Sequence, residues 1–256
     1  MRWAVLSDIH ANLPALRAAL DTLEGASVDG YICAGDLVGY GPHPNECVET
    51  MAELGALCVA GNHELMLLGR LPEARGGTLV RATLDWTRAT LHADARRYIG
   101  ALPLVREVPP FIVAHGSLDD PQRYVRTAQE ARDVFARLRS PTVDLIVLGH
   151  THRPALFREG HGAVRLWPSH RARLPASARH LVNPGSIGQS RQWERRPLVR
   201  FAVVDTKRRS ARWYAIPYDH RPVVADLRRL GISSRAIHLQ PKLRHALVHR
   251  VRRVLR

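Results

Sequence analysis

Eight polar side chains that can bind a metal ion or transfer a proton each follow a short apolar segment of the chain. They combine carboxylate, imidazole and amide groups without a thiolate, a set that suits Mn, Fe, Zn, Co or Ni. This many groups exceed what one tetrahedral ion needs, but they suit two ions about 3.5–4 Å apart that share a bridging carboxylate. The eight residues are Asp8, His10, Asp36, Asn62, His63, His115, His150 and His152.

The motifs that contain these residues differ in how specific they are. The Asp-x-His triplet at 8–10 is common by chance, and the Gly-Asp pair at 35–36 is weaker still. Gly-Asn-His-Glu at 61–64 is more specific. Gly-His-Thr-His at 149–152 is the most specific, because two imidazoles at i and i+2 after a buried strand can face one site. A lone histidine is more often a surface or hydrogen-bonded residue than a ligand, so the ordered set of motifs carries the prediction.

The elements that would position these groups alternate along the first 150 residues. Short apolar segments ending at the candidate ligands are typical of buried strands, and amphipathic spacing between them predicts helices. This alternation predicts an α/β protein, in which ligands bind at the carboxyl ends of the strands. We expect strands at 1–7, 30–34, 56–60, 111–114 and 144–148, and helices at 13–23, 45–54, 78–100 and 127–139.

The pattern changes after His152. Short strand-like segments separated by turns replace the helices, which predicts antiparallel strands in a second sheet or on the far side of one sheet. The stretch 168–180 is rich in Arg, Pro, Ser and Ala and is expected to be a loop. We expect residues 1–217 to form one domain and residues 218–256 to form a basic, helical extension packed on it. The strands are expected at 154–158, 163–167, 181–182, 199–205 and 211–216.

Positive charge is concentrated in the second half of the chain. The net charge is +15, yet residues 1–120 hold 9 basic and 15 acidic side chains against 29 and 8 in residues 121–256. All but two of the basic residues are arginines, whose planar forks match phosphate geometry. A nucleic-acid partner, or an acidic lipid at the basic tail, is therefore one interpretation. An arginine-rich solvated surface is the interpretation we favour.

Composition excludes several other classes of protein. Apolar residues make up 45% and charged residues 24%, as in globular proteins. The longest apolar runs are far below the ~20 residues of a membrane-spanning helix, and the first ten residues lack the features of a secretory signal. Three cysteines without C-x-x-C spacing exclude a disulfide scaffold or a cysteine-rich zinc module. We therefore expect a cytoplasmic protein without a membrane span.

Six segments together resemble the calcineurin-like metallophosphoesterase superfamily, and among its members the small prokaryotic phosphodiesterase branch. The resemblance covers about residues 1–217 and implies an α/β fold, a four-layer αββα sandwich. In it, two mixed β-sheets lie between helices, with a metal site at the carboxyl ends of the strands. The segments are 7–12 (SDIHAN), 35–42 (GDLVGYGP), 61–64 (GNHE), 113–117 (VAHGS), 149–152 (GHTH) and 183–189 (NPGSIGQ).

The resemblance also implies a role for each candidate residue. Two divalent ions would share Asp36, with manganese the expected metal and Fe, Zn, Ni or Co as alternatives. His63 would not be a ligand: while a bridging hydroxide attacks phosphorus, it would donate a proton to the departing oxygen or bind a phosphoryl oxygen. The ligands would be Asp8, His10, Asp36 and His152 for one ion, and Asp36, Asn62, His115 and His150 for the other.

The implied activity is that of a phosphodiesterase acting on a small phosphoester. Alternatives are a phosphomonoesterase or nucleotide phosphatase, a non-catalytic scaffold on the same fold, and a nucleic-acid-cleaving protein; the protein could also be a homo-oligomer. The complete ligand set argues against the scaffold. The phosphoprotein-phosphatase branch has Asp-Arg-Gly after its central Gly-Asp, whereas this chain has Gly39-Tyr40-Gly41. That departure argues against a phosphoserine/threonine phosphatase and against a symmetrical dinucleoside tetraphosphatase.

Three further features have more than one interpretation. The stretch 168–180 could overhang the site or extend a hairpin, and we favour the extension. We expect 183–188 to be a tight turn with glycine at positive φ, rather than a turn whose backbone amides approach the site. Four polar side chains beside the predicted ligands are candidates to orient the imidazoles. They are Asn12, Glu64, Ser117 and Thr151.

Overall fold

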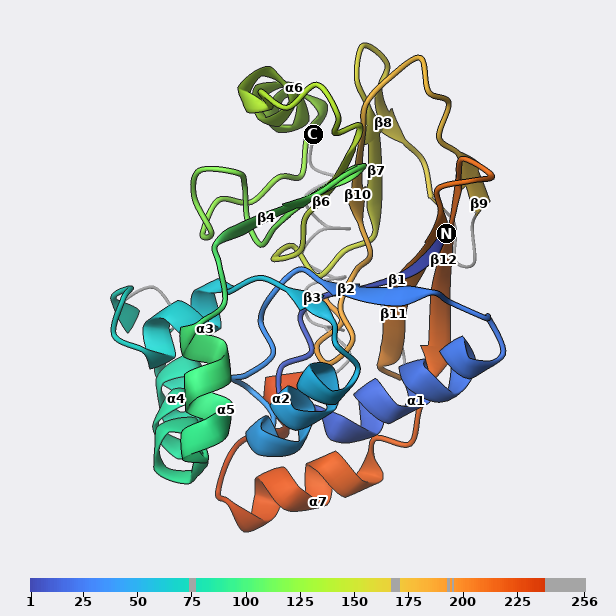
Figure 1. The fold of residues 1–256 in the computed structure, drawn as a ribbon. Helices are drawn as coiled ribbons and strands as arrows, with labels where there is room; N and C mark the ends of the chain where they lie inside the picture. The colour runs from blue at the N-terminus through green and yellow to red at the C-terminus, as the bar shows by residue number, and fades with distance from the viewer. Residues whose placement is uncertain (74–76, 167–170, 193, 195, 238–256) are drawn as a thin grey trace, which may run out of the picture.

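Two six-stranded β-sheets lie face to face between layers of helices (Figure 1). The computed structural model describes residues 1–73, 77–166, 171–192, 194 and 196–237. Both sheets contain parallel and antiparallel strand pairs. The predicted α/β fold with two mixed sheets is therefore confirmed.

The first sheet is built around the strand at the start of the chain. In spatial order its strands are β3 (Leu57–Cys58), β2 (Gly30–Cys33), β1 (Arg2–Leu6), β11 (Leu198–Asp205), β12 (Ser210–Pro217) and β9 (Arg171–Arg173). β1 pairs in parallel with β2 and antiparallel with β11. Alternation along β1 divides its side chains between two cores, because Val5 faces the second sheet while Ala4 and Leu6 face the helices.

Two strands of the second sheet, 111–114 and 145–147, end close to the strand ends of the first sheet. Its spatial order is β4 (Val105–Val108), β5 (Phe111–Ala114), β6 (Leu145–Val147), β10 (His180–Asn183), β7 (Ala155–Arg158) and β8 (Gly162–Val164). β5, β6 and β10 run parallel, while β4, β7 and β8 are antiparallel to their neighbours. The inner faces of the two sheets enclose an apolar core that contains Phe111 and Trp213.

The helices cover the two outer faces unequally. α6 (Ala128–Arg137) packs on the second sheet with its own apolar cluster, and the other helices lie on the side of the first sheet (Figure 1). α1 begins as predicted, because the Asn12 carboxamide oxygen accepts from the Ala15 N–H and Pro14 occupies the first turn. The remaining helices are α2 (Pro44–Glu53), α3 (Asn62–Leu67), α4 (Gly77–Thr90), α5 (Ala93–Gly100) and α7 (Arg221–Arg229), and α1 spans Leu13–Glu24.

The single helix predicted over 78–100 is two helices, α4 and α5. The chain is extended at His92, which ends the helical hydrogen-bonding pattern. Asn45 stabilises this break, since its amide donates to the Thr90 carbonyl at 2.9 Å and its oxygen accepts from the His92 N–H at 2.7 Å. The break depends on a side chain from α2, so the amphipathic pattern of 78–100 could not indicate it.

The antiparallel strands predicted after His152 do not form one sheet. β7, β8 and β10 complete the second sheet, while β11 and β12 join the first. The stretch expected to be a loop, 168–180, contains β9, which pairs with β12 and so extends the first sheet. Residues 167–170 lie outside the described part of the chain. The partner strand, rather than local composition, makes 171–173 a strand.

The C-terminal region is helical where the structure describes it. α7 is followed by a 3-10 turn, Ser234–Ile237, and both pack through one apolar cluster that includes Val223 and Leu227. Residues 238–256 lie outside the described residues, so the extension predicted over 218–256 stays a prediction there, as does the domain boundary. None of the helices in the described ranges is long and apolar enough to cross a membrane.

Candidate metal centre

The predicted site residues lie at strand ends that face one point of the molecule. β1, β2 and β3 of the first sheet and β5 and β6 of the second all lead into this site. Two groups of buried ligand atoms result, and within each group the atoms lie within 4.8 Å of one another. The first group is Asp8, His10, Asp36 and His152, and the second is Asp36, His115 and His150.

Asn62 adds a carboxamide oxygen to the second group. Its Oδ1 lies 3.0 Å from Nε2 of His115, and the same nitrogen is 3.1 Å from Nδ1 of His150 and 3.2 Å from Oδ2 of Asp36. The structure thus brings all seven predicted ligands together in the two expected sets, joined by Asp36. That each of them binds an ion stays a prediction.

Five of these residues have a left-handed backbone, which residues other than glycine seldom adopt. Such strain amounts to about 1–3 kcal/mol per residue and persists only where the surroundings enforce it. Because the strained residues coincide with the predicted ligands, the backbone independently indicates a functional site. The residues and their φ angles are Asp8 (53°), His10 (50°), Asp36 (56°), His150 (61°) and His152 (57°).

Backbone carbonyls orient the four imidazoles. Nδ1 faces the carbonyl oxygen of Val38 in His10, of Ala34 in His115 and of Gln189 in His152, and Nε2 of His150 faces that of Gln122. A carbonyl oxygen only accepts, so each of these nitrogens must donate. In a neutral ring, the other nitrogen then carries the lone pair that metal ligation requires, and it points into the site.

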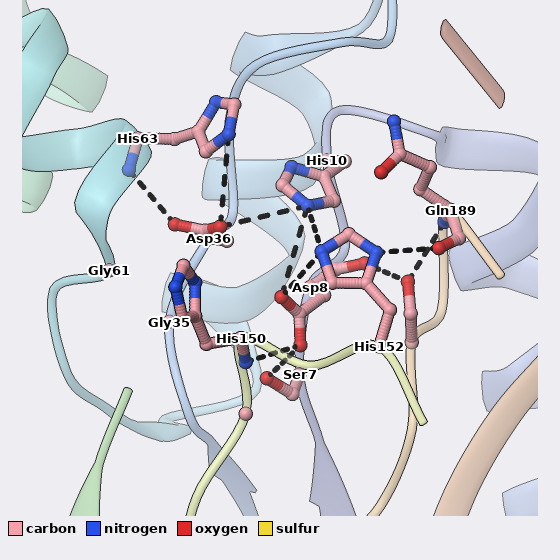
Figure 2. Close-up of polar contacts among 12 residues, drawn as sticks. Ser7, Asp8, His10, Gly35, Asp36, Gly61, His63, His150, His152 and Gln189 are labelled. Atoms are coloured by element: carbon pink, nitrogen blue, oxygen red, sulfur yellow. Dashed lines mark hydrogen bonds and ion pairs between the residues drawn. The ribbon is translucent and has the colours of Figure 1, made fainter. Parts of the chain in front are cut away.

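The donor set fits two divalent cations. Oδ1 of Asp8 is buried and has no hydrogen-bond partner among the residues that the structure describes, although it lies 3.0 Å from Nε2 of His152. Nε2 of His10 is 3.2 Å from Nε2 of His152 and 3.6 Å from Oδ2 of Asp36 (Figure 2). Bare lone pairs at these distances repel each other, and a shared cation would relieve that repulsion. The first group would hold one ion and the second, with Asn62, the other.

The charges at the site suit metal binding. Burial raises the pKa of Asp8 and Asp36, but the neighbouring histidines outweigh it and hold both below their usual range. Burial lowers the pKa of His10 well below its usual value and that of His150 to about 3. At His115 burial is outweighed by Asp36, which raises the pKa to about 9. An ion bound there would displace this proton.

Glu64 holds the loop that carries Asp36. Its carboxylate accepts from the N–H groups of Asp36 at 2.9 Å, Val38 at 3.0 Å and Gly61 at 2.7 Å. Burial and the charge of Asp36 raise the pKa of Glu64 to about 7. Glu64 therefore joins the ends of β2 and β3 and positions the bridging aspartate, although it touches no imidazole.

The side chains predicted to orient the imidazoles do not do so. Asn12 donates to the Gly188 carbonyl and the Tyr218 hydroxyl, and Ser117 bonds within its own loop. Thr151 donates to the Arg153 carbonyl. The prediction was wrong because each of these residues stabilises a loop backbone, while the orienting contacts come from main-chain carbonyls elsewhere in the sequence.

The turn at 183–188 contains a glycine at positive φ, as predicted, and it also supports the loop of Asp8. Gly185 has φ 93°, and the Ser186 hydroxyl donates to the Asp8 carbonyl at 2.8 Å. The Gly188 N–H donates to the same oxygen at 3.0 Å. A Cβ on Gly188 would lie 1.9 Å from the Ile9 carbonyl oxygen, so this position requires glycine.

His63 lies beside the two groups and outside both. Its Nε2 is 4.0 Å from Oδ2 of Asp36, and its backbone N–H donates to Oδ1 of the same residue (Figure 2). Burial lowers the pKa of His63 to about 4, so the ring is neutral near pH 7 and offers one N–H donor. The Gly39 turn packs directly on it, since a Cβ at Gly39 would lie 2.1 Å from Nδ1.

A pocket of about 320 Å³ opens beside the two groups, and two of its lining residues, Tyr124 and Arg191, are ones that the sequence did not single out. Tyr40 packs on the rings of His10 and His63, and Tyr124 stacks on His150 with ring centroids 4.1 Å apart. Arg191 also lines the pocket. Described residues of 168–180 do not line it, which argues against an overhang. The stretch extends the first sheet through β9 and β12 rather than the expected hairpin.

The ordered residues of the site and the arrangement of the sheets match a known family. A model of the calcineurin-like phosphoesterase superfamily domain matches residues 1–209, which include both ligand groups. The chain belongs to this superfamily. Calcineurin-like phosphoesterases are phosphoric ester hydrolases that depend on a dinuclear metal centre, and the two groups around Asp36 are the candidate site for it.

Individual relatives agree with this assignment. An uncharacterized protein from Methanocaldococcus jannaschii is 33% identical over 193 residues, which span 73% of this chain and 76% of that protein. A metallophosphoesterase from Sphaerobacter thermophilus superposes with a TM-score of 0.81 at 30% identity, over 93% of this chain and 98% of that one. A hypothetical protein from Pyrococcus horikoshii OT3 shares the fold, with a TM-score of 0.72 at 20% identity over 92% and 96% of the two chains.

Proposed function

We propose that this calcineurin-like phosphoesterase is a manganese-dependent phosphodiesterase that acts on a small phosphoester. The observation that carries the proposal is the pair of buried ligand groups that share Asp36 and open onto the pocket. When bound, two divalent ions supply a hydroxide nucleophile near neutral pH and stabilise charge on the phosphate oxygens. Manganese suits a set of imidazole, carboxylate and amide donors that includes no thiolate.

The walls of the pocket favour a diester over a monoester. Met66 and Val80 contribute apolar surface that a second ester substituent can cover, and Arg191 is the pocket's only lining arginine or lysine among the described residues. A monoester dianion carries more charge and no second substituent. The pocket therefore suits a monoanionic phosphate with an organic group on each side.

His63 interacts with the phosphate group in this proposal. It reaches the pocket beside Asp36, and its Nδ1 has no partner among the described residues. We place its ring N–H against a phosphoryl oxygen or the departing oxygen, where it donates a hydrogen bond as negative charge develops.

The test compares a diester with a monoester in protein of defined metal content. The protein is stripped with a chelator and reloaded separately with Mn, Ni, Co, Zn or Mg. Hydrolysis of bis-p-nitrophenyl phosphate and p-nitrophenyl phosphate is then measured side by side. We expect manganese to restore activity and kcat/KM to favour the diester. Asp36→Asn, which removes the shared ligand charge, should abolish the restored activity.

Other outcomes would favour the other candidate functions. Preference for the monoester would indicate a phosphomonoesterase or nucleotide phosphatase. Two bound ions without cleavage of either ester would favour a scaffold. Nucleic acid is not the favoured substrate, and retention on heparin that falls steeply with salt would argue otherwise. A cytoplasmic location belongs to the same proposal and is supported by three buried, free cysteines.

A further inference from the structure

Arg191 reaches the pocket from the segment that follows the 183–188 turn. It lines the pocket together with His63, His150 and His152, and it is partly buried. The 39–41 turn, which packs on His63, carries no charged side chain. Among the described residues, Arg191 is therefore the arginine or lysine that lines the pocket beside the two ligand groups.

The guanidinium of Arg191 has hydrogen-bonding capacity to spare. Nε and Nη2 donate to Oε1 of Gln189 at 3.3 and 3.2 Å, and Nη1 donates to the Tyr124 hydroxyl at 3.2 Å. An arginine has five N–H donors. These three bonds leave one N–H on each terminal nitrogen without an acceptor among the described residues. Two such donors at the end of a planar fork match two oxygens of one phosphate.

Among the described residues, Arg191 has no carboxylate within ion-pair distance, although, against the effect of burial, the charge of Asp8 acts on it and helps to raise its pKa. Arg200 on the following strand, by contrast, pairs with Glu194. Withdrawing a guanidinium from water is unfavourable unless an anion compensates it. A ligand that brings negative charge into the pocket would supply the missing partner.

The residues around Arg191 hold its side chain in place. Nε2 of Gln189 donates to the Ala236 carbonyl at 2.7 Å, so the C-terminal 3-10 turn locks the amide whose oxygen accepts from Arg191. The Gln189 carbonyl accepts from His152 (Figure 2). The ring of Tyr124 stacks on His150, and the guanidinium of Arg126 lies 3.8 Å from the centroid of the same ring. These two contacts hold Tyr124 in place. A preordered cation loses little conformational entropy when a ligand binds.

We propose that Arg191 binds the non-bridging oxygens of the substrate phosphate through its two free N–H groups. Gln189 and Tyr124 act as positioning residues that aim the guanidinium into the pocket. The proposal rests on the proposed function, because it assigns the residue that recognises the phosphoester at that site. The ligand class is a phosphate mono- or dianion, including the inorganic phosphate that serves as the probe.

Calorimetric titration with inorganic phosphate tests the proposal on the manganese-loaded protein, alongside KM and kcat for the diester. Arg191→Gln should weaken phosphate binding about 10- to 100-fold, as expected for loss of charge-assisted hydrogen bonds. KM for the diester should rise by a similar factor, while metal content stays unchanged. Arg191→Lys keeps the charge without the fork and should give an intermediate affinity.

Arg212→Gln is the matched control. It makes the same substitution at an exposed arginine that lies over the ring of Tyr214, and Arg212 does not line the pocket. We expect phosphate affinity within about twofold of wild type. If Arg191→Gln fails to fold, the comparison of Arg191→Lys with Arg212→Gln still decides the question.

Two results would overturn the proposal. The first is phosphate affinity that is unchanged in both Arg191 variants. The second is a loss of manganese or thermal stability in Arg191→Gln that accounts for the whole effect, since that is the signature of a structural role. Failure of the proposed function can be distinguished from failure of the Arg191 proposal. If the wild-type protein cleaves neither ester, calorimetry still measures whether phosphate binding depends on Arg191.

Discussion

The Nε2 atoms of His10 and His152 lie 3.2 Å apart, although 142 residues separate the two histidines in the sequence. Both rings donate from Nδ1 to a backbone carbonyl, so both Nε2 atoms carry lone pairs. Burial lowers the pKa of both side chains, which disfavours a proton between them near neutral pH. A metal ion bound by both Nε2 atoms would remove the repulsion between their lone pairs.

Removal of His152 should therefore remove one ion and leave the other. His152 belongs to the first ligand group alone, while the second group keeps all its members. We expect His152→Ala, loaded with manganese and desalted, to hold about one ion per chain by elemental analysis where wild type holds two. His161→Ala, at an exposed histidine, should match wild type. Two tightly held ions in His152→Ala would contradict the assignment of this ligand.

Loss of the His63 side chain should separate metal binding from turnover. His63 lies outside both ligand groups and lines the pocket. We expect His63→Ala to keep both ions while kcat falls by about 10²–10⁴, the usual contribution of a positioned proton-transfer group. Metal analysis and steady-state kinetics on the same samples measure both effects. His92→Ala changes an exposed histidine and serves as the control; loss of ions from His63→Ala would show that His63 is a ligand.

Gly39 and Gly55 offer a matched pair of substitutions that tests how His63 is positioned. Both have positive φ, 83° and 59°, so alanine adds about 1–2 kcal/mol of backbone strain at either position. A Cβ at Gly39 would lie 2.1 Å from Nδ1 of His63, whereas one at Gly55 meets nothing within 4 Å. We expect both variants to lose thermal stability, and Gly39→Ala to lose more, because its Cβ also displaces the buried His63 ring.

Only Gly39→Ala should lower kcat, by displacing the His63 ring, and its metal content should equal that of wild type. Thermal unfolding, metal analysis and diester kinetics of the two variants make the comparison. Equal kcat values in Gly39→Ala and Gly55→Ala would mean that contact with Gly39 does not set the position of His63.

His180 should make the folded protein less stable in acid. It is fully buried at the start of β10, and neither ring nitrogen has a hydrogen-bond partner in the described part of the chain. Burial, with the charges of Arg158 and Arg209, lowers its pKa to about 4 despite Asp144. An unfolded imidazole binds its proton near pH 6.5. The unfolded chain therefore holds more protons between about pH 6.5 and 4, and stability falls as pH decreases through that window.

The phenylalanine substitution at this position removes the titrating group and keeps a ring. We expect the free energy of unfolding of His180→Phe to depend less on pH than that of wild type, by up to about 1.4 kcal/mol per pH unit in that window. Denaturant unfolding at several pH values measures the slope. His92→Phe, at an exposed histidine that is not among the groups acting on His180, should leave the slope unchanged. Parallel curves for wild type and His180→Phe would exclude a contribution from His180.

Much of the candidate site could be predicted because its signals are local. An apolar strand followed by Asp, His or Asn occupies only a few consecutive residues, as at 2–8 and 111–115. The carboxyl ends of neighbouring parallel strands meet at one edge of a sheet. The types and order of these residues were therefore enough to predict a site for two ions with a bridging carboxylate, and the resemblance to the superfamily implied the two ligand sets around Asp36.

The parts that the sequence could not predict depend on contacts between distant segments. The division of the antiparallel strands between two sheets depends on partners such as β1 and β11, far apart in the chain. The break between α4 and α5 depends on Asn45 from α2. Local patterns predict an element but do not identify its partner, so these features followed only from the packed structure.

The sequence by itself determined which groups could bind metal and the strand ends at which they lie, since side-chain chemistry and hydrophobic period are properties of short segments. Only the tertiary structure decided which carbonyls orient the imidazoles and that Arg191 and Tyr124 line the same pocket. The physical reason is that the packing of the two sheets and the C-terminal turn sets the direction of each side chain, and no local spacing encodes it.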